Sequence, residues 1–403
     1  MNRSTTGAAT GSRRPPSLLV PFGTRPEIVK LAPVVTALRA AGGTVRTLAT
    51  GQHTDPGLAD AFFSDLALEP DVRWDLPTGS EPERVGAMLT AAFDELGRTP
   101  RPDAVLLLGD TYTVPLFALA ARRHRIPVVH LEAGLRSFND ESVEEGNRRA
   151  VAGLAAFHLA PTTLAAKLLE ADGVPTDRIA VVGNPVTDSL ARFGPEPVAP
   201  GARDGIVVTA HRATNVDDPE RLRILVELVT SLGAQLGPVR FPLHPRTRDR
   251  LQRAGLIDAI SRAPGVFVEP PLRYPQMLDA IAHARVVVTD SGGLQEEAAW
   301  FGVPVVVLRR STPRWEGVLA GTSTLTGLDA ARAVVATRAF VEPDAQHRAA
   351  TAPCPYGDGH VGPRVASVLS EPTTRALMTV SEPDLTTTLP RGVAEPAFDG
   401  IVG

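Results

Sequence analysis

The chain has 403 residues, of which 43% are hydrophobic and 21% are charged, with a formal net charge of −4. This composition is typical of a globular protein, and the length is sufficient for two compact domains. The charge gives no overall basic field that would gather nucleic acid or anionic lipid, so we expect neither a nucleic-acid partner nor membrane association. A phosphate site would have to be built locally.

Cysteine and histidine content narrows the class further. Cys354 is the single cysteine and nine histidines are scattered along the chain, without zinc-finger spacing. We therefore expect a cytoplasmic protein with no disulfide and no metal. No apolar run approaches the roughly 20 residues that cross a bilayer. Residues 1–15 are basic without an apolar core, and we expect them to form a disordered leader.

From residue 16 onward, short continuous apolar runs alternate with longer amphipathic stretches. This alternation predicts an α/β fold with parallel sheets covered by helices on both faces. The Pro/Gly-rich stretch at 193–205 separates two such sets. We predict two doubly wound Rossmann-like domains facing a central cleft, at 16–198 and 199–370, with the option that the last helix packs back on the first domain. The Thr-, Pro- and Glu-rich segment 371–403 is predicted to be a disordered tail.

Polar residues follow several of the predicted strands. In open parallel sheets, ligands bind beyond the carboxyl ends of the strands. In this chain those positions hold Gly23-Thr24-Arg25, Asp110, Glu132, His211, His244 and Asp290-Ser291-Gly292-Gly293. Side chains of these types at one edge would line a single site.

Two of these strand ends could hold a diphosphate. The Ser291-Gly292-Gly293 turn leads into a helix, where backbone amides can approach a phosphate closely. Arg25 and Lys30 flank another such turn and could neutralise the charge. The alternative is that the glycines only make tight turns and the basic side chains are solvated. The chain lacks both the G-x-G-x-x-G and the G-x-x-x-x-G-K-[ST] patterns, which argues against bound NAD and against ATP hydrolysis.

Ten segments together are similar to a known family. They are GTRPEIVKLAPVV (23–35), GQH (51–53), GDT (109–111), HLEAGLRSFN (130–139), EEGNR (144–148), GNPVTD (183–188), TAHRATNVD (209–217), HPRT (244–247), TDSGGLQEEA (289–298) and YGDG (356–359). In order and spacing, over about residues 17–368, they resemble the non-hydrolysing UDP-N-acetylglucosamine 2-epimerase family. The resemblance implies a fold like that of B-type glycosyltransferases, a homodimer, no cofactor, and inversion at C2 through elimination and re-addition of UDP.

The resemblance also implies roles for individual residues. Asp110, Glu132 and Glu144 match carboxylates that move protons and stabilise the cationic sugar, and His211 matches a group that assists diphosphate departure. The matches that grip the diphosphate or the ribose are Arg25, Lys30, Ser291, Gly292 and Glu297. Further candidate substrate-binding residues are Arg136, His244, Gly293 and Arg314.

Structural alternatives remain for some of these residues. Asp110 could instead cap a helix. Glu144 and the adjacent Glu145 point about 100° apart on a helix, so only one can readily face the site, and Glu144 is chosen by its match to the family. His53, His244 and Arg246 could instead hold a loop or interdomain packing. The Tyr356–Gly359 segment is predicted to be a structural turn.

Three departures from the family pattern bear on specificity. The family usually reads R-[DE]-x-T-[EQ]-R-P-E where this chain has residues 309–316, so Arg310 reverses a charge and Trp315 replaces a proline. Val143 replaces a proline before the paired glutamates. Gln52-His53 is followed by Thr54-Asp55-Pro56, and we expect activation by a second substrate molecule to be weak or absent.

Other functions remain open at this point. A hydrolysing 2-epimerase would release UDP and free N-acetylmannosamine, and a glycosyltransferase of the same fold would require an acceptor. A non-catalytic nucleotide-sugar binder would be favoured if the three carboxylates did not converge.

Overall fold

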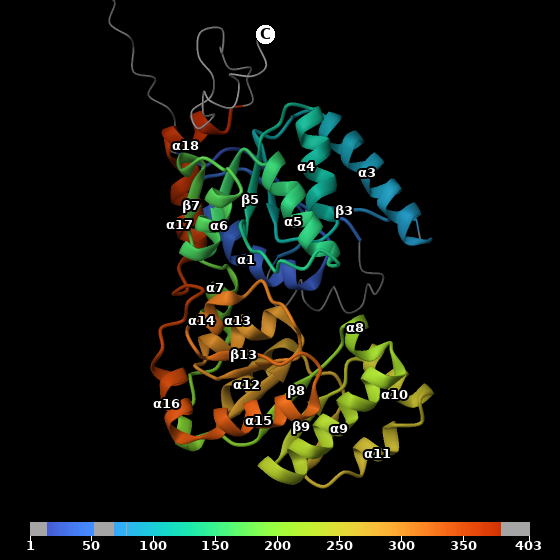
Figure 1. Ribbon diagram of the computed structural model, residues 1–403. Coiled ribbons are helices and arrows are strands. Elements are labelled where there is room, and N and C mark those ends of the chain that lie inside the picture. Colours follow the sequence, from blue (N-terminus) through green and yellow to red (C-terminus); the bar gives the residue numbers. More distant parts are fainter. Residues whose placement is uncertain (1–13, 52–67, 78, 380–403) are drawn as a thin grey trace, which may run out of the picture.

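The computed structural model describes residues 14–51, 68–77 and 79–379, apart from the side chain of Arg25. Residues 1–13 of the predicted leader (1–15) and the Gln52-His53 segment lie outside the described residues. Figure 1 shows an upper half, formed mainly by the first part of the chain, and a lower half formed mainly by the second.

The first half contains a seven-stranded sheet in the order β3-β2-β1-β4-β5-β6-β7, with every adjacent pair parallel. Its strands are β1 (Leu18–Phe22), β2 (Val45–Ala49), β3 (Val72–Arg73), β4 (Ala104–Leu108), β5 (Val128–Leu131), β6 (Phe157–Ala160) and β7 (Ile179–Val181). Its helices are α1 (Arg25–Ala40), α3 (Glu81–Gly97), α4 (Thr113–Arg123), α5 (Val143–Leu154), α6 (Thr163–Ala171), the 3-10 turn η1 (Thr176–Arg178) and α7 (Val186–Phe193).

The second half contains a six-stranded parallel sheet in the order β10-β9-β8-β11-β12-β13. Its strands are β8 (Ile206–Thr209), β9 (Val239–Pro242), β10 (Val266–Glu269), β11 (Val286–Thr289), β12 (Val305–Val307) and β13 (Ser323–Leu325). The helical segments are η2 (Pro200–Ala202), α8 (Ala213–Val216), α9 (Pro219–Leu236), α10 (Pro245–Arg253), α11 (Ile257–Ser261), α12 (Tyr274–His283), α13 (Gly292–Trp300), α14 (Trp315–Leu319), α15 (Ala330–Val341) and α16 (Pro343–Thr351).

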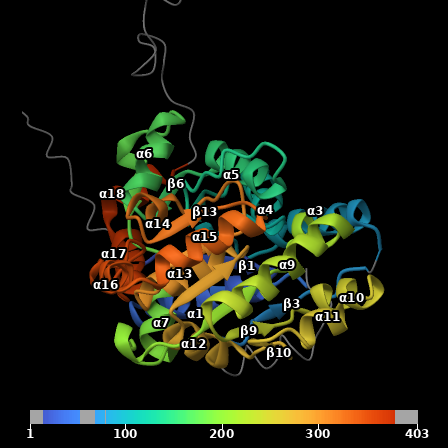
Figure 2. The same cartoon turned by 60° about the horizontal axis from the view of Figure 1, so that its bottom comes forward.

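Continuous apolar strands arise because both faces of each sheet are covered. On β8, Ile206 and Val208 join a core with α9 and α15, whereas Val207 joins a separate core with α12 and α13. Figure 2 shows α9 and α15 together on their side of the second sheet. In the first sheet, Leu18 packs toward α1 while Leu19 packs toward α3 and α4. Alternate residues thus serve opposite cores, which confirms the predicted α/β class with two parallel sheets.

The end of the described chain returns to the first half. Helix α17 (Val361–Ser370) packs on α1 and contributes to the core of the first sheet, as the red segment in Figure 1 shows. A short helix, α18 (Pro372–Leu377), follows, and Met378 is buried in the same core. The prediction of a disordered tail from residue 371 is therefore wrong for 371–379, where Leu377 and Met378 bury apolar surface. Residues 380–403 lie outside the described chain.

Within the described residues, none of the helices is both long and apolar enough to cross a membrane.

Candidate active site

Residues from the facing ends of the two sheets form one buried ionic network. Lys30 Nζ lies 2.5 Å from Glu132 Oε1 and 2.9 Å from Glu296 Oε2. Arg314 Nε lies 2.7 Å from Glu296 Oε1, and the Asn184 amide donates to both glutamates, at 2.5 and 2.9 Å. Lys30 and Glu132 belong to the first half of the chain, whereas Glu296 and Arg314 belong to the second. The network therefore joins the two sheets.

Neighbouring charges in this network shift the pKa values of Lys30 and Glu296 toward the ionised forms. Burial alone would lower the pKa of Lys30, but Glu132 and Glu296 together raise it. Burial would likewise raise the pKa of Glu296, yet Arg314 and Lys30 hold that pKa below its ordinary value. Lys30 and Glu296 stay ionised because their partners are charged and close, which is the condition under which a buried ion pair is tolerated.

Asp110 follows β4 and is held by α5. Arg148 donates to Asp110 Oδ2 from Nε at 2.9 Å and from Nη2 at 2.6 Å. Burial acts to raise the pKa of Asp110, but Arg148 and Arg314 outweigh it and lower the pKa. Since Arg314 comes from the second half, the Asp110 carboxylate lies within the field of both halves. It is an ionised carboxylate at neutral pH.

The paired glutamates on α5 have different surroundings. Glu145 is 1% exposed and accepts hydrogen bonds from the Ser137 amide at 2.7 Å and from Arg148 Nη1 at 2.7 Å. Glu144 accepts from Ser142 Oγ at 2.6 Å. Its pKa is raised by burial but lowered overall by Ser142 and, across the two halves, by Arg212. Glu145 thus holds the backbone before α5, and Glu144 faces charges of the second half.

His211 follows β8 and lies against a fully buried carboxylate. Its Nδ1 is 3.3 Å from Asp290 Oδ1, and its ring centroid is 5.3 Å from that of His244. Asp290 also accepts hydrogen bonds from the backbone amides of His211 and Arg212. Burial lowers the pKa of His211 more than Asp290 raises it. The ring is therefore neutral at pH 7 and oriented by Asp290. His244 itself caps α10 by accepting from the Arg246 amide.

The turn after β11 leads directly into α13. Ser291 is the N-cap of this helix, and its hydroxyl accepts from the Leu294 amide at 3.5 Å. The three atoms nearest to a Cβ built on Gly292 all belong to the Arg314 guanidinium group, at 3.7 Å or more, and a Cβ on Gly293 would lie 4.0 Å from Ser291 Oγ. Backbone amides at this helix start are thus accessible beside a cationic side chain, an arrangement suited to a diphosphate.

Glu297 lies one position further along α13 than the network residue Glu296. It is 7% exposed, and burial together with the Glu296 carboxylate raises its pKa to about 7. Tyr274, at the start of α12, lies beside it and is coupled to it electrostatically. This carboxyl group therefore titrates near neutral pH.

Comparison with known proteins places the chain in a family. The family model described as UDP-N-acetylglucosamine 2-epimerase matches residues 36–370. A relative of that name from Methanocaldococcus jannaschii is 32% identical over 366 residues, covering 88% of this chain and 98% of the relative. The chain belongs to the UDP-N-acetylglucosamine 2-epimerase family. A Pseudomonas aeruginosa relative, named UDP-2,3-diacetamido-2,3-dideoxy-D-glucuronate 2-epimerase, is 33% identical and covers 88% of this chain and 99% of the relative.

Solved structures agree with this family assignment. The Methanocaldococcus jannaschii enzyme in complex with UDP-GlcNAc and UDP superimposes with a TM-score of 0.79 at 32% identity, covering 88% of this chain and 99% of that one. Acinetobacter baumannii MurG is similar at the level of fold alone, with a TM-score of 0.54 at 15% identity over 88% and 98% of the two chains. The predicted B-type glycosyltransferase-like architecture is thereby confirmed.

Not every residue predicted from the sequence lies among the site residues described above. The Arg136 guanidinium group donates to Asp172 Oδ2 at 2.6 and 2.9 Å, and it is 2% exposed. These bonds hold Arg136 in the packing around α6, outside the ionic network, and its assignment to substrate binding stays a prediction. Lys30 is bonded to carboxylates rather than free at the turn. Arg25 begins α1, and its side chain lies outside what the structure describes.

Two residues of the network were missed by sequence reasoning. Glu296 is fully buried and bonds to Lys30, Arg314 and Asn184, whereas only Glu297 was predicted from the sequence. The available signal was the paired glutamates in LQEEA, since adjacent helical positions face different directions. Asn184 lies in a matching segment, but no local pattern indicates that its amide bonds to both Glu132 and Glu296.

The loop at residues 309–316, whose sequence differs from the family pattern, contacts the first half directly. The Trp315 indole donates to the carbonyl of Arg136 at 3.1 Å, and its ring lies 6.5 Å from that of Phe138. Glu316 accepts from the Thr162 hydroxyl at 2.5 Å. The replacement of proline by tryptophan thus adds an apolar contact and a hydrogen bond between the two halves.

Proposed function

We propose that the protein is a non-hydrolysing UDP-N-acetylglucosamine 2-epimerase, which interconverts UDP-N-acetylglucosamine and UDP-N-acetylmannosamine. The observation that carries the proposal is the convergence of Asp110 and Glu144, from the first half, with Arg314 and Arg212 of the second. Family membership and the relatives' names support the same reaction.

The reaction requires catalysis at two bonds, the C2–H bond and the C1–O bond to UDP. The C2 proton of the substrate is not next to a carbonyl group, so it becomes acidic only as the C1–O bond to UDP breaks. In the proposed first step a base takes this proton, the C1–C2 double bond forms, and UDP leaves, giving 2-acetamidoglucal. In the second step a proton adds to the other face of C2 and UDP returns to C1. Carboxylates on both faces of the sugar would serve these transfers.

The electrostatics of the residues suit these roles. Asp110 and Glu144 have lowered pKa values, so both are ionised and can accept a proton or stabilise positive charge on the sugar. The start of α13 and Arg314 would bind the leaving diphosphate. His211 is neutral without ligand, and a nearby diphosphate would raise its pKa and favour the protonated ring, which can then donate. Glu297 would accept hydrogen bonds from the ribose hydroxyls.

We further propose that the enzyme acts in the cytoplasm as a homodimer, without a cofactor, and that its domains are residues 16–198 and 199–370, with the last helix of the second range, α17, packing back on the first domain. These expectations follow from the family resemblance and the composition.

NMR of the protein with UDP-N-acetylglucosamine in deuterated water tests the proposal, with no NAD, metal or acceptor added. Deuterium at C2 together with UDP-N-acetylmannosamine is expected. Free N-acetylmannosamine and UDP would instead establish the hydrolysing reaction, and turnover only with an acceptor would establish a glycosyltransferase.

A further inference from the structure

Two helices of the first half begin with the same short motif. Helix α1 starts in the sequence T-R-P-E at 24–27, and α3 starts in the sequence S-E-P-E at 80–83. The glutamate at the third helical position accepts from the backbone amide of the residue before the helix, Glu27 from Thr24 at 2.7 Å and Glu83 from Ser80 at 2.8 Å. Such a cap stabilises the start of a helix. Capping therefore accounts for part of the role of each glutamate.

The two glutamates differ in burial. Glu83 is exposed, and its Oε2 accepts from the backbone and the hydroxyl of Ser80. Glu27 is 4% exposed, and burial raises its pKa to about 7 although its hydrogen-bond donors oppose the rise. A cap does not require burial, as Glu83 shows, and burial of a carboxylate is unfavourable unless its oxygens gain partners. The additional partner of Glu27 is Thr111.

The two carboxylate oxygens of Glu27 bond to two different strand ends. Oε2 accepts from the Gly23 amide at 3.1 Å, and from the amide and the hydroxyl of Thr24 at 2.7 Å each, in the turn between β1 and α1. Oε1 accepts from the Thr111 hydroxyl at 3.2 Å, in the turn between β4 and α4. Strands β1 and β4 are neighbours in the sheet. Glu27 therefore joins the carboxyl ends of two adjacent strands.

Each of these two turns carries a residue with a predicted role in the reaction. Arg25, predicted to grip the diphosphate, begins α1. Asp110, proposed to accept a proton, immediately precedes Thr111. A change in the separation of the turns would move Asp110 relative to the diphosphate beside which it acts. Misplacement of reacting groups by about 1 Å can cost roughly 10²-fold in rate.

Contacts with α5 and β5 also hold the Asp110 turn. Asn147 of α5 donates to the Asp110 carbonyl at 2.8 Å. His130 of β5 lies with its Nε2 2.8 Å from the Gly109 carbonyl. Neither contact involves the Thr111 hydroxyl, so the turn should stay folded when that hydroxyl is removed.

We propose that Glu27 is a positioning residue of the epimerase reaction, which fixes the turn at the start of α1 against the turn that carries Asp110, so that the diphosphate and the proton acceptor are held at a set separation. This inference rests on the proposed function and deepens it. In this role Glu27 makes no contact with the substrate, and the bonds made and broken at C1 and C2 are unchanged.

Thr111→Val tests the bond with the least disturbance, because valine has nearly the shape of threonine without its hydroxyl. The rate of deuterium exchange at C2 of UDP-N-acetylglucosamine is measured at a pH well above 7, where the Glu27 carboxyl is ionised. This rate should fall by about tenfold, while the Kd for UDP stays within about twofold, because the turn at α1 is untouched. Thr111→Ser keeps the hydroxyl and should restore the wild-type rate.

Glu27→Asp tests the same link from the other side. Aspartate keeps the charge, but it is shorter by one methylene and cannot bond to both turns, so exchange should slow by roughly 10²-fold. Glu83→Asp is the matched control, since it shortens the glutamate of the same cap in an exposed setting. It should leave both the exchange rate and the UDP affinity unchanged.

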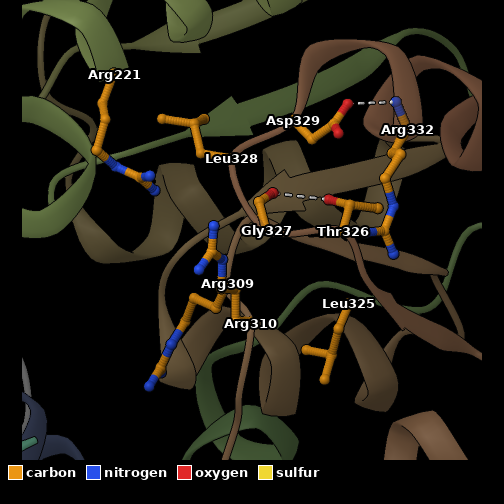
Figure 3. A pocket seen from close by; sticks show the side chains of 9 residues that line it. All are labelled: Arg221, Arg309, Arg310, Leu325, Thr326, Gly327, Leu328, Asp329 and Arg332. Carbon is orange, nitrogen blue, oxygen red and sulfur yellow. Dashed lines mark hydrogen bonds between the residues drawn. The ribbon is translucent and has the colours of Figure 1, made fainter. Parts of the chain in front are cut away.

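A second control comes from a cavity in the second half. The cavity has a volume of about 410 Å³, and Figure 3 shows the four arginines in its wall, Arg221, Arg309, Arg310 and Arg332. Among the described residues, none of those that line it belongs to the candidate active site. Arg332 is exposed, so Arg332→Gln changes the net charge without touching either turn. Exchange and UDP affinity should both be unchanged in this variant.

Rates are expressed per UDP-binding site, counted by calorimetry, so that misfolded protein does not contribute. If Glu27 only caps α1, its variants lose thermal stability but keep the wild-type rate per site. That result overturns the inference, as does a wild-type rate in Thr111→Val, a parallel loss of UDP affinity in that variant, or an equal loss of rate in either control. Each of these leaves the epimerase proposal intact. A wild-type protein that exchanges no deuterium at C2 refutes the proposed function, and the positioning role with it.

Discussion

Lys30 Nζ lies 2.9 Å from Glu296 Oε2, and this contact joins α1 of the first half to α13 of the second. Both side chains are buried, and each has a second oppositely charged partner, Glu132 for Lys30 and Arg314 for Glu296. Because buried charges need partners, the position of one sheet relative to the other and the ionisation of the site depend on each other.

Glu296→Gln should destabilise the protein substantially. The change leaves Lys30 and Arg314 with one carboxylate fewer in a buried setting, and removal of one partner from a buried ion pair costs about 3–5 kcal/mol. Chemical denaturation followed by circular dichroism would measure the loss. Glu220→Gln is the matched control, since that side chain is 80% exposed, and it should change the free energy of unfolding by less than about 1 kcal/mol. Equal stabilities of the two variants would contradict a structural role for Glu296.

Asp110→Asn should abolish most turnover while preserving nucleotide binding. The amide cannot accept a proton from C2, and loss of a general base typically costs about 10²–10⁴-fold in rate. Asp110 contacts Arg148 and not the start of α13, so UDP affinity should fall little. Deuterium incorporation at C2 and calorimetric titration with UDP measure the two effects. Asp177→Asn, at an exposed position in η1, is the control. Full exchange in Asp110→Asn would show that another group handles the proton.

Affinity for UDP-N-acetylglucosamine should rise with pH through about 7. Burial and Glu296 raise the pKa of Glu297 to about 7, so this carboxyl group is protonated below that pH. Ribose hydroxyls donate best to the ionised form, so affinity should fall by up to about tenfold per pH unit below the pKa. The diphosphate diester does not titrate in this range. Calorimetry on both sides of pH 7 would show the dependence.

Glu297→Gln provides the control for that pH dependence. The amide does not titrate, so affinity should be weaker and this component of the pH dependence should disappear. An identical pH profile in the variant would assign the titration to another group, such as His211.

Asp188→Ala should loosen the attachment of α17. Asp188, on α7, accepts from the backbone amides of Val361 and Gly362, each at 2.7 Å. Leaving these two amides at the start of α17 without acceptors should lower the free energy of unfolding by about 2 kcal/mol. Thermal and chemical denaturation measure this, with Asp177→Ala as an exposed control. If Asp188→Ala proves as stable as that control, water replaces the carboxylate without loss.

The fold could be predicted from the sequence because the residue patterns that indicate it are local. Val207 and Val208 both need to be apolar when each face of β8 is covered, and the resulting continuous run distinguishes a buried parallel strand. The segment after residue 370 was misjudged because its polar composition outweighed two apolar residues, Leu377 and Met378. Their burial depends on the position of α1 and α17, which no local pattern specifies.

The candidate site could be predicted from the sequence only in part. Strand-end positions identified Asp110, Glu132 and His211 because parallel strands deliver their carboxyl ends to one edge. The bonding partner of each side chain could not be predicted from the sequence. Arg136 bonds to Asp172, and Lys30 bonds to Glu132 and Glu296, over separations of tens to hundreds of residues.

The sequence by itself determined the α/β class, the two parallel sheets, the family and the strand ends at which chemistry could occur. Only the tertiary structure decided which charges neutralise one another: it drew Glu296 into the buried network, turned Arg136 away from it, and left Arg309, Arg310 and Arg332 facing a cavity. The physical reason is that strand and helix formation follow from neighbouring residues, whereas the ionisation and reach of a side chain follow from groups that only folding brings within a few ångströms.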